Sequence, residues 1–166
     1  MTMIYAHGNS EDLIDSLRFA RKMSGLLKIE FVIFDYSSYG DSQLTSSSES
    51  IFCRDLEVVL GWVSRWQELS NIVLYGFSLG SYPVCYCAAN YNLKAIILQS
   101  PLCSLVSAIS EQPGLFTTDY FSNISLIGKI KCCILIMHSQ NDEIIPISHA
   151  EALIKSYKEQ TQSNKL

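Results

Sequence analysis

A serine lies between two glycines in the segment Gly76-Phe77-Ser78-Leu79-Gly80, directly after the apolar run 71–75 and before a helix-compatible stretch. At such a strand-to-helix turn only small residues fit beside the serine, and its hydroxyl is lifted above the edge of the sheet. That position suits a nucleophile that attacks an acyl carbonyl. The alternative interpretation is a glycine-rich turn with a solvent-facing serine. Ser78 is therefore our candidate nucleophile.

Acyl transfer also needs donors for the developing oxyanion, and the sequence offers two. His7-Gly8-Asn9 follows the first predicted strand directly, so the backbone N–H of Asn9 or of its neighbour Ser10 can serve as one donor. The backbone N–H of Leu79, the residue after the serine, is the second. We expect the side chain of His7 to be structural, shaping the turn by hydrogen bonding.

A carboxylate that orients the base is expected just past the last predicted strand. Asp142 lies there, at the carboxyl edge of the sheet, which is the edge that also holds Ser78. A turn-forming or helix-capping aspartate is the alternative, and Glu143 ranks second as the acid.

The remaining requirement is a general base, and histidine is the residue that most often fills this role. The chain has three histidines, and only His149 follows Asp142, near the start of a predicted helix. We take His149 as the candidate base, against the alternative of a surface or pocket-rim histidine. His7 and His138 precede the acid in the chain.

Composition limits the class of protein. With 166 residues, 48% of them hydrophobic and 17% charged, the chain fits a single globular domain, residues 1–166. The net charge of −4 argues against nucleic-acid binding. No apolar run is long enough to span a membrane, and the N-terminus lacks the features of a signal peptide, so we expect a cytoplasmic protein.

The six cysteines lack zinc-ligand spacing and are expected to be reduced core thiols, with no metal or cofactor.

Apolar runs alternate with amphipathic stretches along the chain. This order predicts an α/β fold: a three-layer sandwich with a mainly parallel, doubly wound sheet of about five strands. The runs are apolar throughout, which is typical of strands buried on both faces. The predicted strands are 2–5, 29–34, 72–75, 95–98 and 133–137, and the predicted helices are 12–24, 49–68, 78–89 and 148–160.

A long irregular segment, residues 101–127, is expected to form a cap-like insertion that walls a binding site. Its apolar residues include Leu102, Phe116 and Tyr120, which we take as candidate contacts for an acyl chain. Packing of these side chains in the core is the alternative.

Several motifs in register resemble the α/β-hydrolase superfamily, closest to its serine aminopeptidase-like members and the branch containing protein depalmitoylases. The motifs are His7-Gly8-Asn9, Phe34-Asp35-Tyr36-Ser37-Ser38-Tyr39-Gly40-Asp41-Ser42, Tyr75-Gly76-Phe77-Ser78-Leu79-Gly80, Ile97-Leu98-Gln99-Ser100-Pro101, Asp119-Tyr120-Phe121-Ser122-Asn123-Ile124, Ile127-Gly128-Lys129-Ile130 and Asp142-Glu143-Ile144-Ile145. The resemblance covers nearly the whole chain. It implies Ser78 as nucleophile, Asp142 as acid, and Asn9 and Leu79 as the oxyanion hole.

The resemblance also implies a function: a serine hydrolase that cleaves acyl esters or thioesters through an acyl-Ser78 intermediate. The family's histidine lies beyond the final strand, so we expect a domain shortened at both ends. This favours two alternatives: a catalytically impaired relative that binds a lipid or a partner, and self-association through exposed sheet edges. A dinucleotide-binding fold is the structural rival, but the turn after Tyr75 lacks the three-glycine register.

Overall fold

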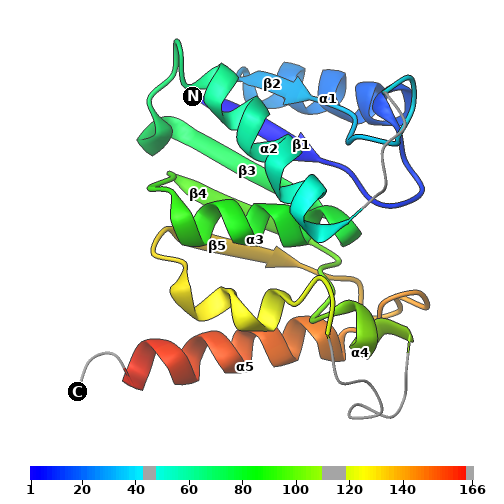
Figure 1. Ribbon diagram of the computed structural model, residues 1–166, viewed down its shortest axis with the longest axis vertical. Coiled ribbons are helices and arrows are strands. Elements are labelled where there is room, and N and C mark those ends of the chain that lie inside the picture. The colour runs from blue at the N-terminus through cyan, green and yellow to red at the C-terminus, as the bar shows by residue number, and fades with distance from the viewer. Residues whose placement is uncertain (43–47, 110–118, 164–166) are drawn as a thin grey trace.

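The computed structural model describes residues 1–42, 48–109 and 119–163. Five parallel strands form one sheet in the order β2-β1-β3-β4-β5 (Figure 1). Their bounds are β1 Thr2–Ala6, β2 Glu30–Ile33, β3 Ile72–Phe77, β4 Ala95–Gln99 and β5 Cys133–Met137. The order has its switch point at β1, where the chain passes first to β2 on one side and then to β3 on the other. The predicted parallel, doubly wound sheet is confirmed.

Helices cover both faces of the sheet and complete three layers (Figure 1). The α-helices are α1 Leu13–Leu27, α2 Glu49–Val63, α3 Ser81–Asn90, α4 Leu105–Ile109 and α5 Ser148–Ser163, and the 3₁₀ turns are η1 Leu69–Asn71, η2 Ser78–Gly80, η3 Asn123–Ser125 and η4 Ile127–Lys129. α1 packs on one face through Phe19 against Tyr5 and Tyr75. α2, α3 and α5 contribute to the core on the opposite face.

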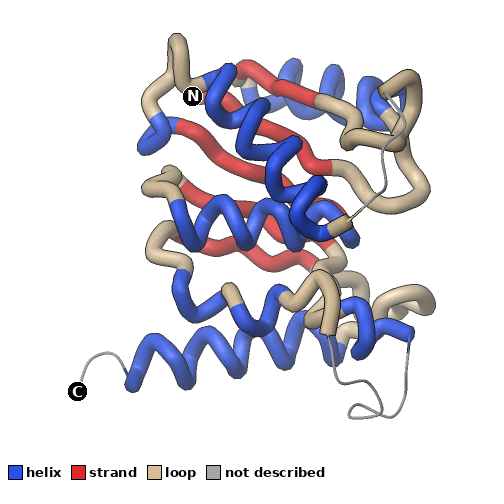
Figure 2. The backbone as a smooth tube through the Cα atoms, in the orientation of Figure 1, coloured by secondary structure: helices blue, strands red, loops and turns tan. Residues whose placement is uncertain are grey.

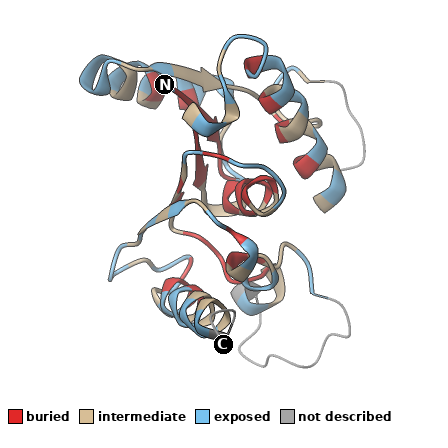
Figure 3. Ribbon diagram, turned by 90° about the vertical axis from the view of Figure 1, so that its left-hand side faces the viewer, coloured by how far each residue is buried: buried red, intermediate tan, exposed pale blue. Residues whose placement is uncertain are grey.

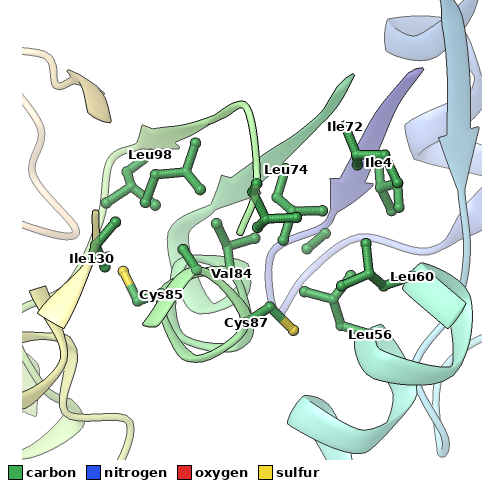
Figure 4. Packing of buried hydrophobic residues seen from close by; sticks show 14 of the residues in the cluster. Ile4, Leu56, Leu60, Ile72, Leu74, Val84, Cys85, Cys87, Leu98 and Ile130 are labelled. Carbon is green, nitrogen blue, oxygen red and sulfur yellow. The ribbon is translucent and has the colours of Figure 1, made fainter. Parts of the chain in front are cut away.

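The larger core lies between the central strands and helices α2 and α3. Figure 4 shows Ile4, Ile72 and Leu74 of the strands pointing toward α2 and α3. In the view coloured by burial, the buried residues gather in the middle strands and on the helix faces turned toward the sheet (Figure 3). Because removal of apolar surface from water is the main favourable contribution to folding, this core fixes the sheet that carries the site.

The edge strand β5 differs from the sequence-based expectation of strands buried on both faces. Leu135 is 52% exposed and Met137 is 37% exposed, while Ile134 and Ile136 pack against the larger core. The reason is the position of β5 at the end of the sheet, whereas α1 packs over β1, β2 and β3 on that face. An apolar run can therefore belong to an edge strand with one uncovered face.

All four predicted helices differ from the observed bounds, and α1 and α5 each end three residues later than predicted. α2 ends at Val63, so Trp66, which lies inside the predicted helix 49–68, falls outside the observed helix and is half exposed. α3 begins at Ser81 because Ser78 and its two successors form a 3₁₀ turn.

The cysteines mostly follow the prediction of free core thiols. Four are buried and Cys132 is half-buried, but Cys133 is exposed on the uncovered face of β5, so the core assignment is wrong for that residue. Residues 110–118 of the expected cap-like insertion, including Phe116, lie outside the described residues, and the single-domain assignment stays a prediction. Among the helices that the structure describes, none has the length and apolar character needed to cross a bilayer.

Candidate active site

The turn at Ser78 is a sharp elbow whose geometry requires the two glycines around it. Ser78 has φ of 50°, in the left-handed region that non-glycine residues rarely adopt. A Cβ on Gly76 would lie 2.6 Å from the carbonyl oxygen of Gly80. A Cβ on Gly80 would lie 2.1 Å from the carbonyl oxygen of Ala6 in β1. The glycines therefore let the start of α3 approach β1 and β3, and this approach holds Ser78 at the carboxyl end of the sheet.

Side chains that the sequence analysis did not single out brace the elbow. The hydroxyl of Ser81 donates to the carbonyl oxygen of Ser78 at 2.6 Å. Asn123 is fully buried, and its amide nitrogen donates to the Ser81 hydroxyl and to the carbonyl oxygen of Leu102, both at 2.8 Å. Asn123 thus ties α3 to the segment after β4. It belongs to one of the family-like motifs, which was the only signal for it in the sequence.

The loops that follow the strands gather at the carboxyl edge of the sheet (Figure 2). Ser78 lines a cavity of about 400 Å³ at this edge. Most of the side chains around it are apolar. Its lining residues are Asn9, Tyr39, Ser48, Phe52, Ser78, Leu79, Leu102, Leu105, Phe121, Ile144 and Ile145. We call this the Ser78 cavity.

Four residues predicted for the site meet in the Ser78 cavity: Ser78, Asn9, Leu79 and Leu102. Tyr120 does not line it, but lines a neighbouring cavity. Further apolar walls come from elements that carry no motif in the sequence, such as Phe52 in α2.

The turn that follows β1 packs directly against the elbow. A Cβ on Gly8 would lie 3.0 Å from Cδ1 of Phe77 and 3.5 Å from the Cβ of Ser78. The absence of a side chain at Gly8 therefore lets the turn that carries Asn9 pack close to Ser78. The side chain of Asn9 is fixed by Tyr39, whose hydroxyl donates to Oδ1 of Asn9 at 2.5 Å. The turn after β1 thus brings Asn9 into the lining of the Ser78 cavity.

His7 has the structural role expected from the sequence. Its ring is fully buried, with Nδ1 2.8 Å from the carbonyl oxygen of Gly8 and Nε2 3.5 Å from Oδ1 of Asp35. Tyr36 packs against the ring with a centroid distance of 4.6 Å. Desolvation by burial raises the pKa of Asp35, and the nearby His7 opposes that rise. This cluster holds the first turn after β1 in place.

Asp142 organises the loop that walls the cavity on the β5 side. Its Oδ1 accepts hydrogen bonds from the backbone N–H groups of Ile145 at 2.9 Å and of Ile144 at 3.1 Å. The hydrogen bond from the Ile145 amide is the main cause of the lowered pKa of Asp142, helped by the Ile144 amide, the Ser100 side chain and the charge of His138. Its Oδ2 lies 3.6 Å from Nε2 of His138. The carboxylate is therefore ionised at neutral pH and shapes the wall around Ile144 and Ile145.

The candidate base His149 is not brought to Ser78. Its Nδ1 accepts a hydrogen bond from the backbone N–H of Cys103 at 3.0 Å, and its ring is 7% exposed. It lines a separate cavity of about 340 Å³ with Ser104 and Asp119. All three histidines of the chain are among the described residues, and none of them lines the Ser78 cavity. The arrangement thus supports a structural His149 that joins α5 to the segment after β4.

Comparisons with known proteins agree with this fold. "Alpha/beta hydrolase domain-containing protein 17B" of Homo sapiens is 31% identical over 159 residues, which are 93% of this chain and 54% of the relative. "Alpha/beta hydrolase domain-containing protein 17C" of Mus musculus is 31% identical over 161 residues, 92% of this chain and 48% of the relative. The chain thus spans about half the length of the curated relatives it matches. No protein-family model matches the chain.

Solved structures of α/β-hydrolases superpose on this chain. Est1E of Butyrivibrio proteoclasticus, with ferulic acid bound, superposes with a TM-score of 0.76 at 18% identity, over 95% of this chain and 76% of that one. Alpha/beta hydrolase domain-containing protein 10 from mouse superposes with a TM-score of 0.68 at 18% identity, over 93% and 75%. Together with the five-stranded parallel sheet, these similarities show that the chain has the α/β-hydrolase fold and resembles the alpha/beta hydrolase domain-containing proteins 17B and 17C.

Proposed function

We propose that this chain carries the nucleophile of a serine hydrolase that cleaves acyl esters or thioesters through an acyl-Ser78 intermediate. The observation that carries the proposal is the position of Ser78, held at a positive φ on the wall of a mostly apolar cavity. A cavity of about 400 Å³ is within the size range of small-molecule sites. Proteins with similar solved structures also support a hydrolase, and one of them is a monoacylglycerol lipase of Paleococcus ferrophilus.

In the proposed reaction the Ser78 hydroxyl oxygen attacks the carbonyl carbon of the substrate. The negative charge that develops on the carbonyl oxygen is stabilised by the backbone N–H groups of Asn9 and Leu79. The alcohol or thiol leaves with a proton, and water then hydrolyses the acyl-Ser78 ester to release a carboxylic acid. Asp142 is assigned as the carboxylate that orients the general base. The proton of Ser78 must pass to a general base, which the described cavity lining does not supply as a histidine.

The apolar side chains around Ser78 favour a substrate with a hydrocarbon acyl chain. Phe52, Leu102 and Phe121 come from three separate segments and surround the same space. Burial of each methylene of an acyl chain against such side chains is worth about 0.8 kcal/mol. This supports esterase or depalmitoylase-type chemistry over cleavage of small polar esters.

A second candidate function is that of a catalytically impaired hydrolase-like protein that binds a lipid or a partner. The observation that favours it is the position of His149, whose ring nitrogen is occupied by the Cys103 amide. On this account the cavity binds the acyl chain, and Ser78 forms no covalent bond.

Hydrolysis of p-nitrophenyl octanoate separates the two candidates. The hydrolase proposal predicts turnover by the native chain and its loss in Ser78→Ala. Ser48→Ala is the matched control, because Ser48 lines the same cavity from the N-cap of α2. Turnover retained in Ser78→Ala would contradict the proposal. Binding of octanoate without any hydrolysis, equal in the native chain and Ser78→Ala, would favour the second candidate.

A further inference from the structure

A second cavity adjoins the Ser78 cavity and has a different chemical character. Its volume is about 620 Å³, and three of its lining residues, Ser48, Leu105 and Phe121, also line the Ser78 cavity. The two cavities therefore meet across these residues. A substrate with its carbonyl at Ser78 and its acyl chain in the first cavity can extend its leaving group into the second. We call the second space the leaving-group cavity.

The leaving-group cavity presents two half-buried carboxylates. Glu49 and Glu57 lie two turns apart on α2 and both line it. Glu49 accepts a hydrogen bond from the backbone N–H of Phe121, and Glu57 accepts one from the hydroxyl of Tyr91 at 2.8 Å. Among the residues that the structure describes, neither carboxylate forms an ion pair. Hydrogen bonds fix the positions of these groups, but no described cation neutralises their charge.

Aromatic rings line the same cavity. Tyr82 and Tyr86 come from α3, and Tyr120 comes from the segment before η3. Tyr82 is held against Phe121, with ring centroids 5.3 Å apart. The face of an aromatic ring attracts a cation within about 6 Å of its centroid. Carboxylates and tyrosine rings around one space are thus the groups that bind an organic cation.

The effect of the two carboxylates is visible on their neighbours. Cys53 lines the leaving-group cavity, and its pKa is raised to about 12, mainly by burial and further by the charges of Glu57 and Glu49. Burial and the charge of Glu49 also raise the pKa of Tyr82. Both raised pKa values mean that an additional negative charge is disfavoured in this space. The negative potential of the two carboxylates favours a positive charge there.

We propose that the site takes acyl esters or thioesters whose leaving group carries a positive charge, with the acyl chain in the Ser78 cavity and the cationic group between Glu49, Glu57 and the tyrosine rings. The orientation of the substrate rests on the proposed function. The cation preference of the cavity does not depend on turnover. It can therefore be tested in a chain that lacks the Ser78 hydroxyl.

The test compares two ligands of the same shape on the Ser78→Ala variant by isothermal titration calorimetry. S-octanoylthiocholine carries a trimethylammonium group, and its S-(3,3-dimethylbutyl) counterpart carries a neutral tert-butyl group instead. We expect the cationic ligand to bind about tenfold more tightly, from the carboxylates and the aromatic faces together. The preference should fall as salt is added, because exposed charges are screened.

Variants that remove the two carboxylate charges test whether these groups cause the preference for the cationic ligand. With Glu49→Gln and Glu57→Gln combined on the Ser78→Ala chain, the preference should fall to about twofold, leaving the contribution of the rings. Glu151→Gln on α5 is the matched control and should leave the preference intact, since Glu151 is exposed and does not line the cavity. If the double variant does not fold, Glu57→Gln alone should lower the preference about threefold.

Two results would overturn the inference. One is equal binding of the cationic and neutral ligands by Ser78→Ala, and the other is an undiminished preference in the glutamate variants. Failure of the proposed function would look different: the native chain would hydrolyse neither thioester, while the cationic preference of Ser78→Ala would persist.

Discussion

Replacement of Gly80 by alanine should destabilise the fold severely, although it adds only one methyl group. The new Cβ would lie 2.1 Å from the carbonyl oxygen of Ala6, 2.7 Å from its carbonyl carbon and 2.7 Å from the carbonyl oxygen of His7. Favourable non-bonded contacts begin at about 3.5 Å, so the overlap with Ala6 is more than 1 Å, by rough arithmetic. All three atoms belong to backbone at the end of β1, which cannot turn away as a flexible side chain can. We expect a loss of about 3 kcal/mol or more in the free energy of unfolding.

Gly61→Ala in α2 is the matched control for this substitution. A Cβ there meets no atom within 4 Å, so the same chemical change should stabilise the helix by about 0.5–1 kcal/mol. Urea unfolding followed by circular dichroism measures both. With a slope of about 2 kcal/mol per molar urea, Gly80→Ala should lower the midpoint by roughly 1.5 M, while Gly61→Ala should raise it slightly. An unchanged midpoint for Gly80→Ala would refute the close approach of the elbow to β1.

Three further predictions concern the elbow, a histidine and a thiol. Because Ser78 has φ of 50°, Ser78→Gly should be more stable than Ser78→Ala by about 1 kcal/mol in thermal unfolding, and equal melting temperatures would argue against the strained backbone. Burial, helped by the charge of His138, lowers the pKa of His149 in the fold, so the unfolded chain binds the proton more readily. Stability should therefore be full above pH of about 6.5 and fall below it, and His149→Gln should reduce this pH dependence of the urea midpoint. Cys133 is exposed while four other cysteines are buried, so a disulfide reagent should modify one thiol of the folded chain rapidly, and Cys133→Ser should abolish that fast phase.

The elbow could be predicted from the sequence because its requirements are local. Gly76, Ser78 and Gly80 lie within one turn. The glycines that let this turn approach β1 can be read directly from the sequence. The strands were predicted to within about two residues because buried parallel strands are apolar throughout. Asn9 was placed beside Ser78 for a related reason: both follow central strands whose carboxyl ends meet at one edge of the sheet.

Other features depend on contacts between distant residues, which no local pattern encodes. His149 is 46 residues from Cys103, whose amide donates to its Nδ1, and this contact cannot be read from the chain order that suggested His149 as the base. Phe52 of α2 and Phe121 lie 69 residues apart in the chain, yet they line the same cavity with their rings 5.5 Å apart. The exposure of Leu135 follows from the place of β5 at the sheet edge, which apolar composition does not reveal.

The most direct test of the central claim is whether Ser78 is an activated nucleophile. The native chain, Ser78→Ala and Ser48→Ala would each be exposed to a fluorophosphonate reagent, followed by intact-mass analysis and peptide mapping. The account predicts a single adduct on Ser78 in the native chain and in Ser48→Ala, and none in Ser78→Ala. A folded native chain that takes up no adduct, or an adduct that persists in Ser78→Ala, would contradict it.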